Sequence, residues 1–187
     1  MRKNKKLYYN LAGIFSFVVL ILLDQLTKKA AVLQLKGQEA VPVIKDIFEL
    51  YYLENRGAAF GILQGRQSVF LIIAIAAMVI LVYIYVKMPV SRRFMLLRVL
   101  LVFIAAGAVG NFIDRAVQGY VVDFFYISAI NFPIFNVADI YAVSYTHLDV
   151  YKRQNMEILI KPSRFPKKLW KDWIQVLLYA VSRLEIH

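Results

Sequence analysis

Long apolar segments with basic residues at their ends dominate this sequence. Residues 69–86 and 94–113 supply runs of about 18 and about 20 residues, the length of helix that crosses the hydrocarbon core of a bilayer. Residues 7–35 form a longer run that contains Asp24 and Lys28. It follows a basic N-terminus, as in a signal peptide, but it continues past these charges without a small-residue cleavage site at the right place. The sequence therefore predicts three retained transmembrane helices.

A fourth helix is expected over residues 135–151, and it is the marginal one. It would rise about 25 Å at 1.5 Å per residue and end on Lys152 and Arg153 as anchors. His147 and Asp149 lie within it, which weakens the apolar pattern. With this helix, the sequence predicts an all-α integral membrane protein built as a four-helix transmembrane bundle.

Charges at the helix ends indicate the orientation. Basic residues without an acidic neighbour precede the first helix and fill the connection between the second and third: Arg2, Lys3, Lys5, Lys6, Lys87, Arg92, Arg93 and Arg98. The loop over residues 36–66 carries both signs of charge, so the positive-inside rule places it outside and the basic ends in the cytoplasm. Residues 41–53 of this loop are rich in β-branched and aromatic residues and predict a small extracytoplasmic β element.

Composition narrows the chemistry. The chain has no cysteine, and its only histidines are His147 and His187, so a thiolate site is excluded and a histidine triad or multi-histidine metal site would have to come from the last quarter of the chain. Its net charge is +11, but the basic residues gather at helix ends and are not interleaved with aromatic stacking residues, so we expect no nucleic-acid partner. We expect no metal and no cofactor, and carboxylates are the expected agents of any hydrolysis.

Charged or polar residues at membrane depth call for a partner or a function. Asp24 and Lys28 stand four apart on one helix face, and either a structural ion pair or a substrate-facing role would explain them. The segment over residues 54–61, which begins with Glu54, contains small residues that let the backbone approach another group closely, and its Asn55 offers both a donor and an acceptor. A plain loop with glycines would look similar.

A further group of candidate residues lies at the end of the third helix. Gly107 belongs to the glycines that allow close helix packing, and Asn111, Asp114 and Arg115 are polar. An Asn, an Asp and an Arg at i, i+3 and i+4 can satisfy one another, which favours a scaffold over a catalytic role.

Asp123 and Asp139 differ from the other acids because neither has a basic residue within four positions. If the hairpin between the third and fourth helices brings them together, desolvation and mutual repulsion would raise one pKa, so that the pair holds one proton at neutral pH. The ionised carboxylate could then draw a proton from water while the protonated one donates to the substrate. The alternative is that each carboxylate simply caps a helix or binds the backbone.

Five segments resemble, in their order, the motif blocks of the lipoprotein signal peptidase (signal peptidase II) family. They are Asp-Gln-Leu-Thr-Lys at 24–28, Asn-Arg-Gly-Ala-Ala-Phe-Gly at 55–61, Gly-Asn-Phe-Ile-Asp-Arg at 110–115, Val-Val-Asp-Phe at 121–124 and Phe-Asn-Val-Ala-Asp at 135–139. The resemblance covers about residues 7–144 and implies a family domain over 1–144. After Ser144 the chain departs from the family, and residues 145–187 form a basic tail whose first ten residues resemble translated adapter sequence.

The resemblance implies four transmembrane helices in the bacterial inner membrane, both termini cytoplasmic, and a β-rich cradle beside an active site near the outer face. It implies an aspartic endopeptidase that acts as a monomer on diacylglyceryl-modified prolipoproteins among membrane phospholipids, cutting before the lipid-bearing cysteine. The catalytic pair would be Asp123 and Asp139. The supporting residues would be Asp24, Lys28, Asn55, Gly107, Asn111, Asp114, Arg115, Asn136 and Ala138.

A non-enzymatic transporter or channel subunit, in which intramembrane acids line an ion path, is the main alternative. Such a path expects acids spread through the depth of the bilayer. Here the four candidates, Asp24, Asp114, Asp123 and Asp139, all map near the outer boundary, which favours chemistry at that surface.

Overall fold

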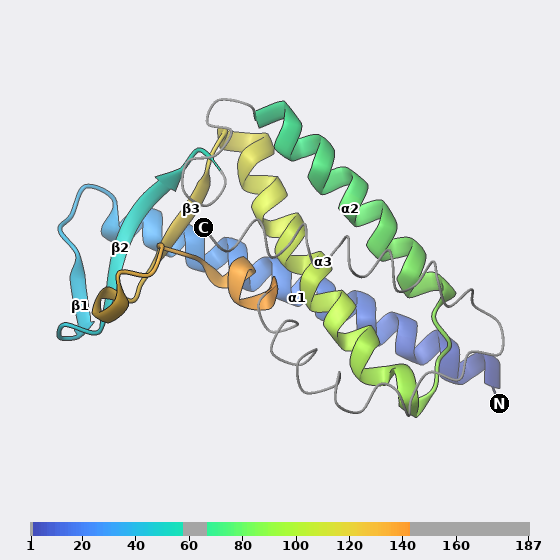
Figure 1. The fold of residues 1–187 in the computed structure, drawn as a ribbon. Coiled ribbons are helices and arrows are strands. Elements are labelled where there is room, and N and C mark those ends of the chain that lie inside the picture. Colours follow the sequence, from blue (N-terminus) through green and yellow to red (C-terminus); the bar gives the residue numbers. More distant parts are fainter. Residues whose placement is uncertain (1, 58–66, 143–187) are drawn as a thin grey trace.

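The computed structural model describes residues 2–57 and 67–142 (Figure 1). Its helices are α1 over Arg2–Leu35, α2 over Gln67–Lys87 and α3 over Arg92–Gln118. They run side by side as an elongated layer in which α3 packs against both α1 and α2. Compared with the expected bounds, α1 begins earlier, at Arg2, and α3 continues to Gln118, where the chain turns through Gly119.

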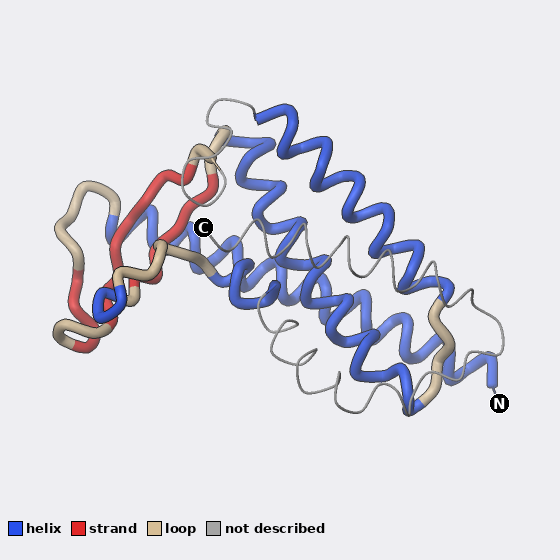
Figure 2. Tube along the Cα trace, in the orientation of Figure 1, coloured by secondary structure: helices blue, strands red, loops and turns tan. Residues whose placement is uncertain are grey.

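A small antiparallel sheet covers one end of the helices (Figure 2). Its strands, β1 over Val41–Ile44, β2 over Phe48–Asn55 and β3 over Val121–Tyr126, lie in the order β1-β2-β3. A β element was expected where β1 and β2 lie. β3 was not predicted, although the β-branched and aromatic residues around Asp123 are typical of a strand.

Packing joins the sheet to α1. Ala31 and Leu35 at the end of α1 form a buried cluster with Val122 and Phe124 of β3. Because successive side chains of a strand point to opposite faces, this anchors one face of β3 on α1 and turns Asp123 to the other.

The expected fourth helix is described only at its start. Residues 137–142 are helical, and a short 3-10 helix, η2 over Ser128–Ile130, precedes them. The remainder of the segment expected to reach residue 151, and the tail over 145–187, lie outside the described residues.

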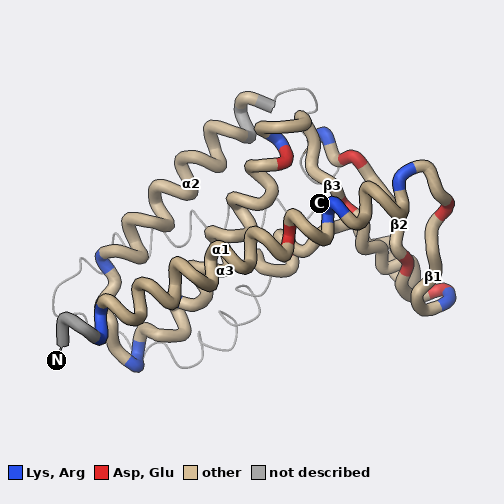
Figure 3. The backbone as a smooth tube through the Cα atoms, turned by 180° about the vertical axis from the view of Figure 1, so that it is seen from behind, with Lys and Arg blue, Asp and Glu red and all other residues tan. Residues whose placement is uncertain are grey.

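Two of the described helices are long and apolar enough to cross a membrane by length and composition, α1 over Lys5–Leu35 and α3. The apolar part of α2, Leu71–Lys87, is shorter. Figure 3 shows only basic residues at the end where α1 begins and α2 connects to α3, and both basic and acidic residues around the sheet. Large apolar side chains are exposed along the helices, as contact with lipid requires: Leu11, Phe15, Leu26, Ile72, Val79 and Val86.

Close packing against α3 depends on Gly107 and Gly110. A Cβ atom at Gly107 would lie 2.5 Å from the Ala138 carbonyl oxygen, and one at Gly110 would overlap the carboxylate of Asp24. Asp24 is fully buried, so it has little room to move. The two glycines thus bring α1 and residues 137–142 against α3.

We expect Gly110→Ala to destabilise the protein by about 1–3 kcal/mol, because the added methyl group overpacks a site that cannot expand freely. Thermal unfolding in detergent measures this. Ala116→Ser, which adds one atom on an exposed part of α3, is the matched control and should leave the melting temperature unchanged. Equal melting temperatures for Gly110→Ala and the wild-type protein would contradict this account of the packing.

Candidate active site

Asn136 joins Asp123 to Asp139. Its side-chain amide donates to Oδ1 of Asp123 over 2.6 Å, and its backbone N–H donates to Oδ2 of Asp139 over 3.0 Å. Asn136 is fully buried. Backbone hydrogen bonds between Phe135 and residues 124–125 hold this segment against β3. The two carboxylates that the sequence singled out therefore share one neighbour.

The register of the sheet determines the surroundings of Asp123. β2 pairs antiparallel with β3, Leu53 opposite Asp123, and Asn55 at the end of β2 donates its side-chain amide to Oδ2 of Asp123 over 2.9 Å. Both carboxylate oxygens thus accept amide hydrogen bonds, and the residue is buried. Among the described residues Asp123 forms no salt bridge.

Burial, and next the negative charge of Asp139, raise the pKa of Asp123 to about 7. The hydrogen bonds from Asn55 and Asn136 act in the opposite direction, because they favour the ionised carboxylate. Asp123 can therefore gain or lose a proton near neutral pH, as a general acid or base must.

Asp139 lies in the first turn of the helical residues 137–142 and forms a reciprocal cap with Asn136. The Asp139 backbone N–H donates to Oδ1 of Asn136 over 3.2 Å, while Oδ2 of Asp139 accepts the Asn136 N–H. Its other oxygen, Oδ1, accepts from the side-chain amide of Asn111 over 2.9 Å. Asp139 therefore caps a helix, as the alternative explanation expected, and it also lies next to Asp123.

A buried network of ion pairs around Lys28 adjoins Asp139 through Asn111. The Lys28 ammonium contacts Oδ2 of Asp24 at 2.9 Å and Oδ2 of Asp114 at 3.0 Å, and it donates to Oδ1 of Asn111 over 2.8 Å. Asp24 also accepts the backbone N–H of Ala138 over 3.0 Å. The ion-pair interpretation of Asp24 and Lys28 therefore describes what is observed, and the network fixes the start of the segment that carries Asp139.

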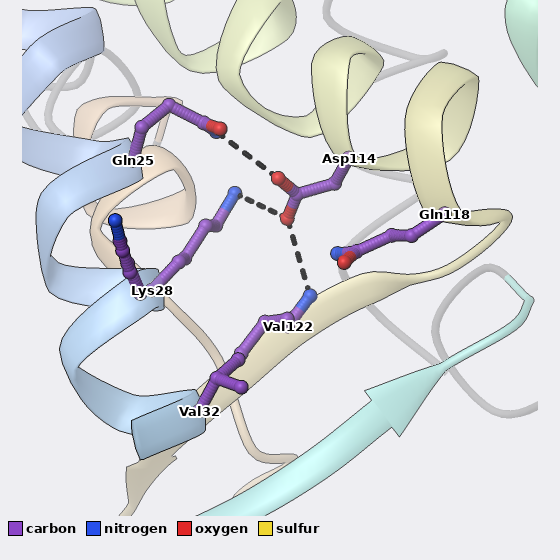
Figure 4. Close-up of a pocket in the computed structure, with 7 residues that line it drawn as sticks. Gln25, Lys28, Val32, Asp114, Gln118 and Val122 are labelled. Atoms are coloured by element: carbon purple, nitrogen blue, oxygen red, sulfur yellow. Dashed lines mark hydrogen bonds and ion pairs between the residues drawn. The ribbon is translucent and has the colours of Figure 1, made fainter. Parts of the chain in front are cut away.

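The polar residues of α3 divide into two groups. Asn111 and Asp114 join the Lys28 network, and Asp114 also accepts the backbone N–H of Val122 over 3.2 Å (Figure 4). Arg115 instead donates to the Gly57 carbonyl over 3.3 Å, at the end of the described part of the loop after β2. These side chains were expected to satisfy one another. In the structure Asn111 and Asp114 both contact Lys28 of α1, and Arg115 contacts the loop after β2.

Gln25 is a part of the network that the sequence did not identify. Its side-chain amide donates to Asp24, to the Gly110 carbonyl and to Asp114. A polar residue between Asp24 and Lys28 in an apolar helix was the available signal. A pocket of about 260 Å³ opens beside this network (Figure 4) and is lined by Gln25, Lys28, Lys29, Val32, Asp114, Gln118 and Val122. In residues 2–57 and 67–142, no group of three or more His, Cys, Asp or Glu is arranged to hold a metal ion.

The raised pKa of Asp123 predicts that the free energy of unfolding depends on pH. Its folded pKa of about 7 exceeds the ordinary value of 3.8, so wild-type stability is lost as the pH rises from about 4 through 7. Asp123→Asn has no such loss, and its stability relative to wild type should improve over this range. Thermal unfolding from pH 4 to 8 measures this, with exposed Asp46→Asn as control. A constant difference between Asp123→Asn and wild type would contradict the raised pKa.

Comparisons with protein families and with individual proteins point to the same family. Residues 16–148 match the family described as signal peptidase (SPase) II. The lipoprotein signal peptidase of Brevibacillus brevis is 45% identical over 132 residues, which cover 71% of this chain and 84% of that protein. That of Clostridium novyi is 41% identical over 126 residues, covering 66% and 84%.

The similarity extends to solved structures. Two structures described as a bacterial membrane enzyme, obtained by the in meso method, are similar to this chain. One has a TM-score of 0.66 and 31% identity and covers 83% of this chain and 94% of its own. The other has a TM-score of 0.68 and 33% identity and covers 77% and 93%.

Proposed function

Because this chain belongs to the signal peptidase II family, and removes signal peptides from prolipoproteins, we propose that it does so as an aspartic endopeptidase with Asp123 and Asp139 as its catalytic pair. The observation that carries the proposal is the bridge through Asn136, which places two acids of different surroundings beside each other. The substrate is a diacylglyceryl-modified prolipoprotein, cut before the lipid-bearing cysteine.

The mechanism follows from one proton held between the two carboxylates. The ionised carboxylate draws a proton from a water molecule as the water attacks the scissile carbonyl carbon. The protonated carboxylate donates its proton to the carbonyl oxygen. As the C–N bond breaks, the carboxylate that took the proton from water passes it to the leaving amine, and a hydroxyl of the tetrahedral intermediate returns a proton to the other carboxylate. Side-chain amides of Asn55, Asn111 and Asn136 hold three of the four carboxylate oxygens, and the Asn136 backbone N–H holds the fourth, so that each acid keeps its orientation during the transfer.

The supporting residues act by position. Lys28 pairs with both Asp24 and Asp114, and Asp24 also holds the Ala138 N–H at the start of the segment bearing Asp139. Gly107 leaves room for the Ala138 carbonyl against α3. Arg115 holds the Gly57 carbonyl beside Asn55. In this scheme none of these residues exchanges a proton with the substrate.

The protein is a membrane protein, and we propose a four-helix, multi-pass topology in the bacterial inner membrane. The basic end of the helices, with both termini, lies in the cytoplasm, and the sheet and the active site lie at the outer face among phospholipids. The distribution of charge in Figure 3 supports this orientation. We propose that the protein acts as a monomer.

The transporter alternative is disfavoured by the arrangement of its acids. Asp24 and Asp114 share Lys28, while Asp123 and Asp139 share Asn136. The four acids thus form one connected cluster beside the sheet, where an ion path would need them in succession across the membrane.

A cleavage assay with matched substrates tests the proposed function. The purified protein should release the signal peptide from a diacylglyceryl-modified prolipoprotein and leave the same prolipoprotein without lipid intact. Equal cleavage of both substrates would contradict the proposed substrate class, and cleavage of neither would contradict the activity.

A further inference from the structure

Glu54 is the centre of a charged cluster at the end of β2, next to Asn55. Its Oε1 accepts from the Lys36 ammonium at 2.9 Å and from the Tyr52 hydroxyl at 3.2 Å, and its Oε2 accepts from Arg56 at 2.9 Å. These residues lie outside the apolar helices, and the resemblance assigned a role to none of them.

The strand geometry couples this cluster to the candidate active site. Side chains alternate along a strand, so Tyr52 and Glu54 lie on one face of β2 and Asn55 on the other. Arg56, which follows the strand, reaches back to Glu54. Asn55 is the last residue of β2, and strand ends open more readily than strand centres. The donor to Asp123 is thus carried by the part of the strand that most needs an anchor.

The cluster supplies anchors in two directions. Lys36 follows directly after α1, which ends at Leu35, so its ion pair with Glu54 ties β2 to that helix. The Arg56 guanidinium lies 5.2 Å from the ring centre of Tyr120, which precedes β3, so it ties β2 to the turn after α3. The end of β2 is therefore fixed to the two helices that carry the buried ion network.

The charge of Glu54 persists at any pH at which the enzyme would work. Hydrogen bonds from Lys36, and next from Arg56, lower the pKa of Glu54 to about 2. Because this pKa is depressed, the contribution of the ionised carboxylate is present above its ordinary value near 4.5 and is lost only as the pH falls toward 2. Tyr52 and Tyr120 are the other titratable groups that face the cluster.

We propose that Glu54, held by Lys36 and Arg56, is a positioning residue that fixes the end of β2 so that Asn55 donates to Asp123. The inference rests on the proposed function, since it assigns a purpose to the Asn55–Asp123 hydrogen bond. Glu54 acts through Asn55 and does not touch the substrate. Its ion pairs are partly exposed, with 26% of the Glu54 side chain and 51% of the Lys36 side chain accessible, so the expected effect is moderate.

The test compares Glu54→Gln with Glu49→Gln, the same substitution on the same strand at a residue that forms no salt bridge in the described part of the chain. We expect Glu54→Gln to lower kcat about 3- to 10-fold with KM nearly unchanged, and Glu49→Gln to match wild type. Lys36→Met should behave like Glu54→Gln, and Lys36→Arg should restore most of kcat.

A double-mutant cycle separates positioning from general loosening. If Glu54 acts through Asn55, adding Glu54→Gln to Asn55→Ala should lower kcat no further than Asn55→Ala alone. Losses that multiply, or a Glu54→Gln kcat equal to that of Glu49→Gln, would overturn the inference. Neither result bears on the proposed function, which fails if the protein does not cleave the lipid-modified prolipoprotein or if Asp123→Asn cleaves within tenfold of the Asp46→Asn control.

Discussion

Asp123→Asn is expected to lower the rate of signal-peptide release by about 10³-fold or more, since an amide can neither give nor take the proton that the reaction moves. The substitution keeps the size of the side chain but replaces one accepting oxygen with an NH2 group that faces an amide donor, so folding of the variant is checked by its melting temperature. The measurement is single-turnover cleavage of a diacylglyceryl-modified prolipoprotein in detergent or vesicles.

The matched control is Asp46→Asn. Asp46 is exposed in the turn between β1 and β2 with a backbone φ of 58°, a conformation that asparagine also adopts. It should cleave at the wild-type rate. If Asp123→Asn folded normally and cleaved within tenfold of this control, the catalytic role of Asp123 would have to be abandoned.

Lys28→Met should have the largest effect on stability. The Lys28 ammonium is buried between the carboxylates of Asp24 and Asp114, and removing it leaves two buried negative charges without their cation. Breaking a buried ion pair from one side costs about 3–5 kcal/mol. We expect a loss of this size in the free energy of unfolding, measured by denaturant titration in mixed micelles.

Lys29→Met is its control, because Lys29 is the exposed neighbour on the same helix. It should unfold at nearly the wild-type denaturant concentration. Adding Asp114→Asn to Lys28→Met should recover part of the loss, since one uncompensated charge is then removed. Equal stability of the two lysine variants would show that the network contributes no net stabilisation.

The local sequence was sufficient to distinguish the acid that pairs with a nearby lysine from the two acids that form no ion pair. Asp24 has Lys28 four positions later on the same helix, and the structure pairs them, whereas Asp123 and Asp139 have no basic neighbour and form no salt bridge among the described residues. Periodic local contacts of this kind are visible in a single sequence.

The contacts that complete the site are not local. Asn55 reaches Asp123 only because β3 pairs with β2, a register determined by packing between segments far apart in the chain. The residues around Asp123 had the composition of a strand, but a strand is stable only with a partner, which the sequence did not identify.

Arg98 illustrates the same limit at the other end of the helices. In the sequence it groups with Arg92 and Arg93 among the basic residues between the second and third helices. The structure buries its guanidinium, which donates to the carbonyls of Tyr85 and Met88 at the end of α2 and to Asn10 of α1. Charge patterning does not distinguish these basic residues, and only tertiary packing shows which of them turns inward.

The central claim is that Asp123 and Asp139 work as one unit. Single-turnover cleavage by Asp123→Asn, Asp139→Asn and the double variant tests it most directly. Because two carboxylates that share one proton fail together, all three should fall to the same residual rate. A double variant slower than either single variant by the product of their losses, or a single variant that cleaves at the wild-type rate, would contradict it.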